Sequence, residues 1–183
     1  MKLYVNREEG FVGTSIKKDE FVEECSDIDD IITFTENGDM MVTKVDSKKF
    51  IGKNIIHVAV FKKKDNRTVY NMIYRDGKRG TSYIKRFSVT GVTRDKTYNL
   101  TRGTVGTKLL YFTSNPNGEA EIISVILRQS GSIKKLKWDL DFADLEIKGR
   151  ASKGNIVTKY SVKKIEFKEK GLSTLKPRKI WFD

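Results

Sequence analysis

The sequence predicts an all-β domain, and three observations lead to this prediction. Short runs rich in Val, Ile, Phe, Tyr and Thr recur along the whole chain, as is typical of strands. Turns built on Asn, Asp or Glu with Gly separate many of these runs. Evidence for helices is thin, since the best candidate is one short turn around Lys17 to Glu24. We therefore expect a repeated β unit.

Five segments fit a strand, a turn and a second strand. In chain order they are Lys2–Thr14, Ile31–Val45, Tyr70–Phe87, Leu109–Val125 and Ile147–Tyr160. Their turn glycines are Gly10, Gly38, Gly77, Gly118 and Gly154. Asn-Gly and Asp-Gly tolerate positive φ at both central residues, so type I′ hairpin turns are expected. The glycines lie 28 to 41 residues apart, close to the period of about forty residues of a four-stranded propeller blade.

Three further apolar runs between the hairpins also read as strands: Ile55–Phe61, Ile122–Leu127 and Tyr160–Phe167. An isolated hairpin is marginal in water, so neighbouring units must stack to bury a face. With 183 residues, the chain suits one compact array better than two independent domains. The sequence therefore predicts a propeller-like arrangement of about five four-stranded blades in a single domain, residues 1–183.

The composition narrows the classes of function. With 38% hydrophobic residues the chain is too apolar for intrinsic disorder. Its single cysteine, Cys25, excludes an internal disulfide framework and a multi-cysteine zinc site, and suits a reducing cytoplasm. No run approaches the length that spans a bilayer, so neither secretion nor membrane insertion is expected.

The net charge of +12 is unevenly distributed, with −7 over residues 1–47 and +19 over residues 48–183. A positive field over most of the fold favours a polyanionic partner, because cations that neutralise phosphates release counterions. Nucleic acid is the leading partner class, ahead of an anionic membrane. A merely solvated, lysine-rich surface is the alternative. The acidic opening, with Glu23, Glu24, Asp27, Asp29 and Asp30, predicts a negative sector on an otherwise positive surface.

A basic, glycine-containing loop recurs ahead of a strand. Lys48–Asn54 precedes Ile55, Thr101–Lys108 precedes Leu109, and Gly171–Lys179 is a degenerate third version. Glycine lets the backbone approach a phosphate, and the flanking Lys and Arg supply charge. Each loop alone is an ordinary turn, but repetition at equivalent places favours contact with a DNA backbone.

Hairpins with Thr-Glu-Asn-Gly or Tyr-Arg-Asp-Gly turns, alternating with these loops, resemble the β-pinwheel. That is the C-terminal domain of the A subunits of the bacterial type IIA topoisomerases, gyrase and topoisomerase IV. The resemblance covers essentially the whole chain. It implies propeller-like blades that exchange a strand between neighbours, with duplex DNA bending around a basic outer rim.

The same resemblance implies that the strand-cleaving tyrosine and the ATPase lie in other domains. On that basis we expect the chain to be a fragment of a longer protein, with no catalytic residues and no cofactor of its own. Its expected partners are the catalytic core of its own subunit, the ATPase B subunit, and duplex DNA, in the bacterial cytoplasm at the nucleoid.

Gyrase carries a Gln-Arg-Arg-Gly-Gly-Lys-Gly box in the loop that lets DNA wrap fully. The segments Lys48–Asn54 and Arg102–Lys108 keep glycine and basic residues but lack this box. The chain therefore looks more like the A subunit of topoisomerase IV, whose domain would bend DNA, present the transported segment and help to select topology. Gyrase-type wrapping through a degenerate box stays an alternative.

The candidate phosphate contacts are the cations of the loops and the third hairpin. They are Lys48, Lys49, Lys53, Arg75, Lys78, Arg79, Arg102 and Lys108, followed by Lys85, Arg86, Lys153, Lys159, Arg178 and Lys179.

Two rival functions stay open. A protein-interaction β-propeller would use the positive charge for solubility or for docking to an acidic surface. An RNA-binding β module would stack bases on exposed aromatic side chains. The candidates for stacking are Tyr70, Tyr74, Tyr83, Tyr98, Trp138 and Trp181, most of which we expect to pack between blades instead.

An enzyme is the least supported class. His57 is the only histidine and sits in an apolar run, as expected of a packed strand residue. Asp27, Asp29 and Asp30 lack the spacing of an EF-hand loop, so we expect a solvated loop and no metal site.

Overall fold

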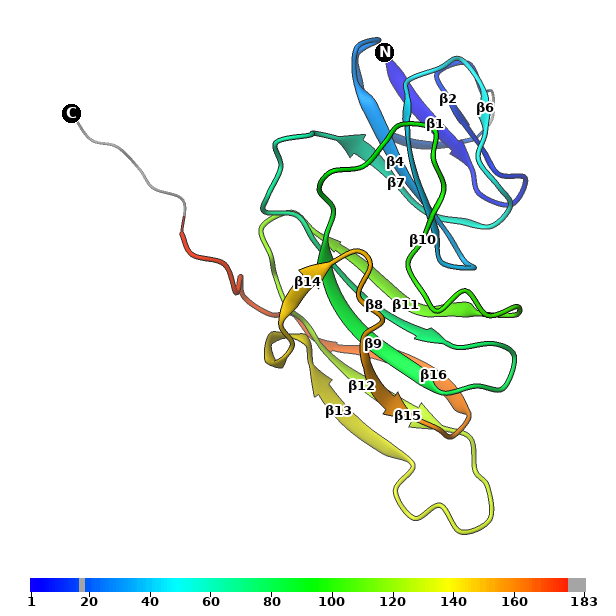
Figure 1. Ribbon diagram of the computed structural model, residues 1–183, viewed down its shortest axis with the longest axis vertical. Coiled ribbons are helices and arrows are strands. Elements are labelled where there is room, and N and C mark those ends of the chain that lie inside the picture. Colours follow the sequence, from blue (N-terminus) through cyan, green and yellow to red (C-terminus); the bar gives the residue numbers. More distant parts are fainter. Residues whose placement is uncertain (17–18, 178–183) are drawn as a thin grey trace, which may run out of the picture.

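The computed structural model describes residues 1–16 and 19–177 and consists almost entirely of strands (Figure 1). The described residues contain sixteen strands and one short 3₁₀ turn, η1 (Phe142–Asp144). The predicted all-β, propeller-like class is confirmed. Among these residues no helix has both the length and the apolar character needed to cross a membrane.

Hydrogen bonding groups the described strands into four sheets. The first has the order β3 (Glu20–Glu24), β1 (Lys2–Asn6), β2 (Phe11–Gly13) and β6 (Lys49–Phe50). The second has the order β10 (Tyr98–Asn99), β5 (Asp39–Lys44), β4 (Asp30–Thr35) and β7 (Ile55–Phe61). The third has the order β11 (Lys108–Asn115), β8 (Val69–Arg75), β9 (Ser82–Ser88) and β14 (Ile147–Gly149), with β15 (Asn155–Thr158) also on β9. The fourth has the order β13 (Lys137–Asp141), β12 (Ile122–Leu127) and β16 (Val162–Glu169).

Two edge strands return to a sheet that the chain has already left. β6 pairs with β2 after the chain has built β4 and β5 of the second sheet. In the same way, β10 pairs with β5 after β8 and β9 of the third sheet. Each returning strand ties two neighbouring sheets together through the chain itself. The exchange of a strand between neighbours that the resemblance implies is therefore present.

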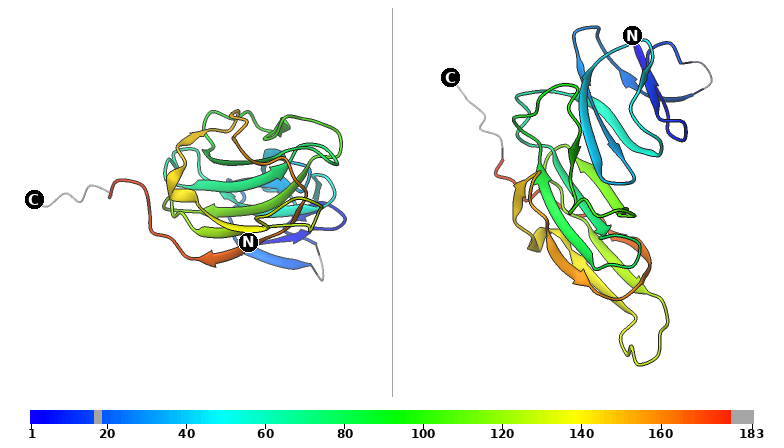
Figure 2. Two further views of the ribbon diagram at one scale, coloured as in Figure 1. Left: turned by 90° about the horizontal axis from the view of Figure 1, so that it is seen from below. Right: turned by 45° about the vertical axis from the view of Figure 1, so that its right-hand side comes forward.

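The sheets follow one another along the long axis and pack face to face (Figure 2). Alternate residues of a strand point to opposite faces. In β4, Ile31 joins a core cluster with Leu3 of the first sheet, whereas Ile32 joins one with Met72 of the third. A third cluster joins the third and fourth sheets. Because both faces of the middle sheets are covered, all six residues of β4 are buried, including the polar residues Asp30, Thr33 and Thr35.

Three of the five predicted hairpins are confirmed, namely β1–β2, β4–β5 and β8–β9. The prediction for Leu109–Val125 is wrong. β11 pairs with β8 of the third sheet, while β12 pairs with β13 and β16 of the fourth. The turn at Gly118 therefore connects two sheets, because the first of its flanking strands already completes the edge of the third sheet.

The fifth hairpin, Ile147–Tyr160, is also wrong. Its two strands do not pair with each other; β14 runs parallel to β9 and β15 runs antiparallel to it along the same edge. In the first two sheets the corresponding edge is occupied by β6 or β10. In the third sheet this edge is open, so both short strands fill it and no separate sheet forms from this repeat.

The turn glycines all have positive φ, as expected: 87° at Gly10, 92° at Gly38, 73° at Gly77, 67° at Gly118 and 89° at Gly154. The type I′ prediction is nevertheless wrong. In the described part of the chain the only residues other than glycine with positive φ are Asn54 and Asp95, so the residue before each turn glycine is not left-handed. At the second hairpin the Gly38 amide donates to the Thr35 carbonyl at 3.0 Å. A type I turn followed by a left-handed glycine produces this pattern.

The helical turn expected around Lys17 to Glu24 is wrong where the structure describes it. Residues 20–24 form β3, which pairs with β1, and residues 17–18 lie outside the described part. Pairing with β1 determines the conformation of this short segment, because an isolated helix of this length is not stable in water. The other predicted strands are confirmed as β7, β12 and β16.

Candidate nucleic-acid interface

Four hairpin turns lie along one edge of the molecule, on the right and at the lower end in Figure 1, and we call this the turn edge. They are residues 6–11, 35–39, 75–82 and 127–137, which connect β1–β2, β4–β5, β8–β9 and β12–β13. The first two basic loops pack against these turns. The Ile51 amide donates to the Gly10 carbonyl at 2.7 Å, and the Gly77 amide donates to Thr107 Oγ1 at 3.0 Å.

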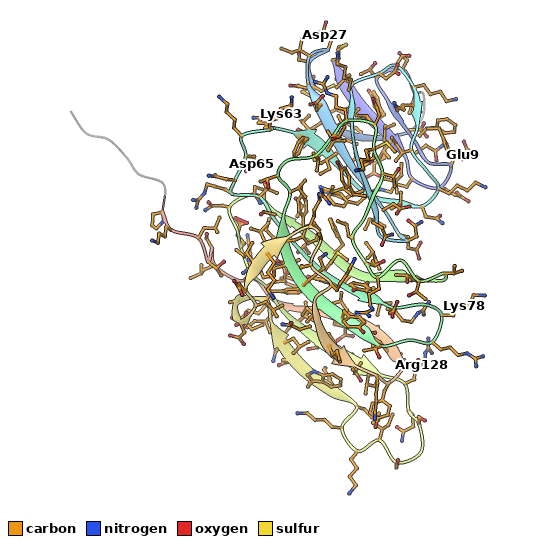
Figure 3. The ribbon with its side chains drawn as sticks, viewed as in Figure 1. Glu9, Asp27, Lys63, Asp65, Lys78 and Arg128 are labelled. Carbon is orange, nitrogen blue, oxygen red and sulfur yellow. The ribbon has the colours of Figure 1, made fainter. Side chains whose placement is uncertain are left out.

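The charge of the turn edge changes sign along its length. In the first two turns acidic side chains outnumber basic ones: Glu8, Glu9, Glu36 and Asp39. In the last two turns basic side chains outnumber acidic ones: Arg75, Lys78, Arg79, Arg128, Lys134, Lys135 and Lys137. Figure 3 shows Glu9, Lys78 and Arg128 in this order along the edge. The third and fourth sheets therefore present the positive field that attracts a polyanion.

The cations of the first basic loop differ in their surroundings. Lys48 lies over the ring of Phe11, with Nζ 4.6 Å from the ring centroid. Lys49 forms an ion pair with Asp95 at 3.0 Å. Lys53 is exposed and has no ion-pair partner within residues 1–16 and 19–177. Lys53 is thus the cation of this loop that is best placed to meet a phosphate.

The third hairpin turn presents Arg75, Lys78 and Arg79. Lys78 and Arg79 are exposed, and neither forms an ion pair in the described part of the chain. Arg75 is half-buried, because its Nε donates to the Gly77 carbonyl at 2.8 Å and a terminal nitrogen donates to the Gly106 carbonyl at 3.4 Å. These bonds hold the Arg75 side chain against the second basic loop.

In the second basic loop the cations already have acidic neighbours. Arg102 Nε lies 3.7 Å from Asp76 Oδ2, and its guanidinium stands 5.5 Å from the centroid of the Tyr83 ring. Lys108 Nζ lies 3.2 Å from Glu36 Oε1. The Lys108–Glu36 pair is solvent-exposed, so it contributes little to stability and can give way to a phosphate at low cost. In the other pair Arg102 is exposed, whereas Asp76 is half-buried.

Lys85 is not placed to contact DNA, because its side chain is only 3% exposed. Its ammonium donates to the carbonyls of Leu100 at 2.8 Å, Arg150 at 3.0 Å and Ser152 at 2.6 Å. The alternation of β9 turns this lysine towards the loops that cover the sheet, where it joins three chain segments. From the sequence Lys85 is predicted to contact phosphate, but it is a buried residue that stabilises the fold.

Arg86 is likewise 1% exposed and joins the third and fourth sheets. Its guanidinium donates to Asn71 Oδ1 at 2.8 Å, to the Gly118 carbonyl at 3.1 Å, to the Glu119 carbonyl at 3.3 Å and to Thr174 Oγ1 at 3.0 Å. All its contacts are internal, so the prediction of a phosphate contact fails here for the same reason as at Lys85.

The buried state of Lys85 gives the protein a measurable pH dependence. Burial first, and the charge of Lys153 second, lower the pKa of Lys85 to about 7. The unfolded chain, with its normal lysine pKa, then binds more protons than the folded chain above about pH 7, so stability rises with pH. We expect the free energy of unfolding of wild type, minus that of Lys85→Met, to increase between about pH 7 and 9 by up to about 1.4 kcal/mol per pH unit.

Urea unfolding followed by circular dichroism measures this difference, and Lys62→Met, at an exposed lysine, is the matched control. If the difference in free energy of unfolding between wild type and Lys85→Met does not change with pH, the lowered pKa of Lys85 is contradicted.

Four candidates come from the end of the chain. Lys153 is exposed, but its Nζ donates to the Thr101 carbonyl at 2.9 Å. Lys159 is exposed and lies 5.6 Å from the centroid of the Tyr160 ring. Arg178 and Lys179 lie outside the described residues.

The structure also reveals cations that the sequence pattern did not indicate. Arg128, Lys134, Lys135 and Lys137 lie in the β12–β13 turn and continue the basic part of the turn edge. This hairpin has a long turn without Asn-Gly, although Ser-Gly-Ser at residues 130–132 is itself a turn signal. Lys62, Lys63 and Lys64 form an exposed run on the opposite edge, where Figure 3 labels Lys63.

Most of the aromatic candidates for base stacking pack inside the fold, as expected. Tyr70, Tyr74 and Tyr98 are buried, and Trp138 packs against the third core cluster. Tyr83 is half-buried and stacks on Tyr74 with ring centroids 5.3 Å apart. Trp181 lies outside the described residues.

His57 packs among aromatic rings, with its ring centroid 5.8 Å from that of Phe34 and 5.7 Å from that of Phe112. Burial, and then the charge of Arg7, lower the pKa of His57 to about 4, so the ring is neutral at pH 7. The expectation of a packed strand histidine is confirmed.

Two acidic residues near the start of the chain, Asp29 and Asp30, accept hydrogen bonds within the fold. Asp30 Oδ1 accepts from Arg94 Nε at 2.9 Å, and Asp29 Oδ2 accepts from the Ser26 amide at 2.8 Å. Within the described ranges no group of three or more His, Cys, Asp or Glu side chains is arranged to hold a metal ion.

Comparison with known proteins agrees with this architecture. Residues 2–170 match the family described as the topoisomerase C-terminal domain of Bacteroidota. The chain is 27% identical over 169 residues to the A subunit of DNA topoisomerase 4 from Borreliella burgdorferi, a match that covers 92% of this chain and 25% of that protein. The chain thus spans about a quarter of the length of this relative. No solved structure matches it. With the family match extending over nearly the whole chain, the protein belongs to the family of bacterial topoisomerase C-terminal domains.

Proposed function

We propose that this chain is the DNA-binding and DNA-bending domain of a protein like the A subunit of topoisomerase IV. It holds duplex DNA on the turn edge to present the transported segment and to select topology. The chain itself is non-catalytic in this proposal. Strand cleavage belongs to the catalytic core of its own subunit, and ATP hydrolysis to the ATPase B subunit, in the bacterial cytoplasm at the nucleoid.

One observation carries the proposal: the turn edge of the third and fourth sheets presents exposed cations that have no ion-pair partner among the described residues. Lys78, Arg79 and Arg128 are exposed there and form no ion pair within the described residues. An ion pair would have to break before a phosphate could bind, whereas these side chains need give up only water. Turns of successive sheets place them in a row, which suits the regular spacing of phosphates along a duplex.

The chemistry of the edge favours binding that does not depend on base sequence. Its functional groups are flexible cations and backbone loops, which contact phosphates and carry no information on bases. Behind the basic turns, the third and fourth sheets share a closely packed core and cannot readily deform. A duplex that follows several turns must therefore adapt its own path, so DNA flexibility sets the preference.

The test is binding to an end-labelled duplex of about forty base pairs, with energy transfer between its ends to report bending. Five exposed cations are counted: Lys78, Arg79 and Arg128 of the turn edge, Lys53 of the first basic loop and Lys159 after β15. They predict about five phosphate contacts and a slope of log K against log salt of about −4.5. Between about 50 and 200 mM salt the affinity should then fall by about 10²- to 10³-fold. The ends of the duplex should approach each other on binding.

Matched charge reversals locate the interface. Lys53→Glu/Lys78→Glu alters the turn edge, and Lys62→Glu/Lys63→Glu makes the same change in net charge at exposed lysines of the opposite edge. We expect the first pair to weaken binding about tenfold or more, and the second by less than about threefold. A flat salt dependence would instead favour a protein-interaction propeller, and a preference for single strands would favour an RNA-type module.

A further inference from the structure

A basic cleft of about 360 Å³ opens on the turn edge where the third sheet meets the fourth. Four cationic side chains line it: Arg75, Lys78 and Arg79 from the β8–β9 turn, and Arg128 from the start of the β12–β13 turn. In Figure 3, Lys78 and Arg128 lie on the same edge of the molecule. Two sheets thus contribute positive charge to one hollow, although these residues are about fifty positions apart in the chain.

No acidic residue is among the described side chains that line the cleft. None of its four cations has an ion-pair partner in the described part of the chain. This sets the cleft apart from the neighbouring basic loop, where Arg102 pairs with Asp76. Like charges brought together without counter-charges repel each other, and a bound anion relieves this repulsion.

The rest of the wall combines apolar side chains with two serines. Leu110 and Val162 line the cleft together with Tyr160, whose side chain is 47% exposed. Apolar walls lower the local dielectric and so strengthen the attraction of the cations for an anion. The hydroxyl groups of Ser82 and Ser161 add hydrogen-bonding capacity.

One of the cations is held in position before any ligand arrives. Arg75 is fixed by its bonds to the carbonyls of Gly77 and Gly106. The Arg128 backbone is fixed too, because its amide donates to the Ser161 carbonyl at 3.0 Å. A site whose groups are already ordered loses less entropy on binding.

We propose that this cleft binds a phosphate ester, with the phosphate among the four cations and the attached sugar against Tyr160 and Val162. The volume lies in the range of ligand sites and exceeds what a bare phosphate requires. The favoured source is the sugar-phosphate backbone of one DNA strand. The cleft would then anchor the duplex as it passes from the third sheet to the fourth. This choice of source rests on the function proposed above.

The test uses two serine variants that each add one negative charge. Ser161→Glu places a carboxylate in the cleft, and Ser132→Glu places one at an exposed position of the neighbouring β12–β13 turn, outside the cleft. The hydrogen bond that residue 161 accepts is through its backbone, so it survives the change. Circular dichroism of each variant verifies that it is folded. We expect Ser161→Glu to weaken duplex binding about tenfold and to reduce the salt slope by about one, and Ser132→Glu to weaken it less than about threefold.

A second titration distinguishes the source of the phosphate. Deoxythymidine monophosphate is added to wild type and to both variants, and heat of binding is measured. If Ser161→Glu abolishes binding of the mononucleotide but leaves duplex affinity unchanged, the cleft is a phosphate site that takes a free nucleotide. Loss of duplex affinity in Ser161→Glu without binding of the mononucleotide would assign it to the DNA backbone.

The inference fails if the two serine variants bind the duplex and the mononucleotide equally well. The proposed function still stands in that case, provided that Lys53→Glu/Lys78→Glu weakens duplex binding. If wild type does not bind duplex at all, the proposed function fails, and the mononucleotide titration alone decides whether the cleft is a phosphate site.

Discussion

Replacing Arg86 by methionine is expected to lower the free energy of unfolding by about 3 to 5 kcal/mol, the range typical of breaking a buried charged network. Methionine keeps much of the side-chain volume, so the loss arises from hydrogen bonds and charge and not from a cavity. Urea unfolding monitored by circular dichroism measures the change.

The size of this effect follows from the network around the guanidinium. Arg86 donates to Asn71 Oδ1 at 2.8 Å, and Asn71 Nδ2 in turn donates to the carboxylate of Glu121 at 3.0 Å. Glu121 is only 5% exposed. Without the positive charge nearby, a carboxylate is left buried and uncompensated. The carbonyls of Gly118 and Glu119, at the junction of the third and fourth sheets, lose a donor as well.

Arg79→Met is the matched control, because it removes the same functional group from an exposed turn. It should change the free energy of unfolding by less than about 0.5 kcal/mol. In DNA binding the order should reverse. Arg79→Met should weaken duplex binding more than Arg86→Met, because Arg79 faces the proposed DNA path and Arg86 does not. Equal stabilities for the two variants would show that the buried network contributes little.

The second large effect is expected for Gly10→Ala. Gly10 has φ of +87°, and a Cβ placed on it would lie 2.2 Å from the carbonyl oxygen of Gly52 and 2.8 Å from the amide nitrogen of Lys53. Both neighbours are backbone atoms and cannot rotate away. The Gly10 carbonyl also accepts the amide of Ile51 at 2.7 Å, which holds the returning strand β6 to the first sheet. An added methyl group must therefore push the β1–β2 turn and the first basic loop apart.

Gly91→Ala separates the clash from the backbone strain. Gly91 also has positive φ, +61°, but a Cβ there meets no heavy atom within 4 Å. We expect Gly91→Ala to cost about 1 kcal/mol, the strain of a left-handed alanine. Gly10→Ala should cost about 3 kcal/mol or more, because the clash adds to that strain. If both variants lose the same stability in thermal and urea unfolding, the close approach of the loop to the turn is not significant for folding.

The sequence by itself determined the features that depend on local chemistry. Alternating β-branched and aromatic residues define the all-β class, and glycine marks the left-handed turn positions, as at Gly38. The excess of Lys and Arg after residue 47 sets the sign of the partner's charge whatever the fold.

Only the tertiary structure decided which strands pair and which cations reach solvent. The turn at Gly118 has the local signature of a hairpin, but β11 and β12 join different sheets because long-range pairing partners compete for each edge. Lys85 and Arg86 are neighbours of exposed cations in the sequence, yet β9 lies in the middle of a stack and its side chains meet other chain segments on both faces. Arg128 joins Arg75 in one cleft only because the third and fourth sheets pack together. Local composition carries no information on such contacts, since they depend on residues far apart in the chain.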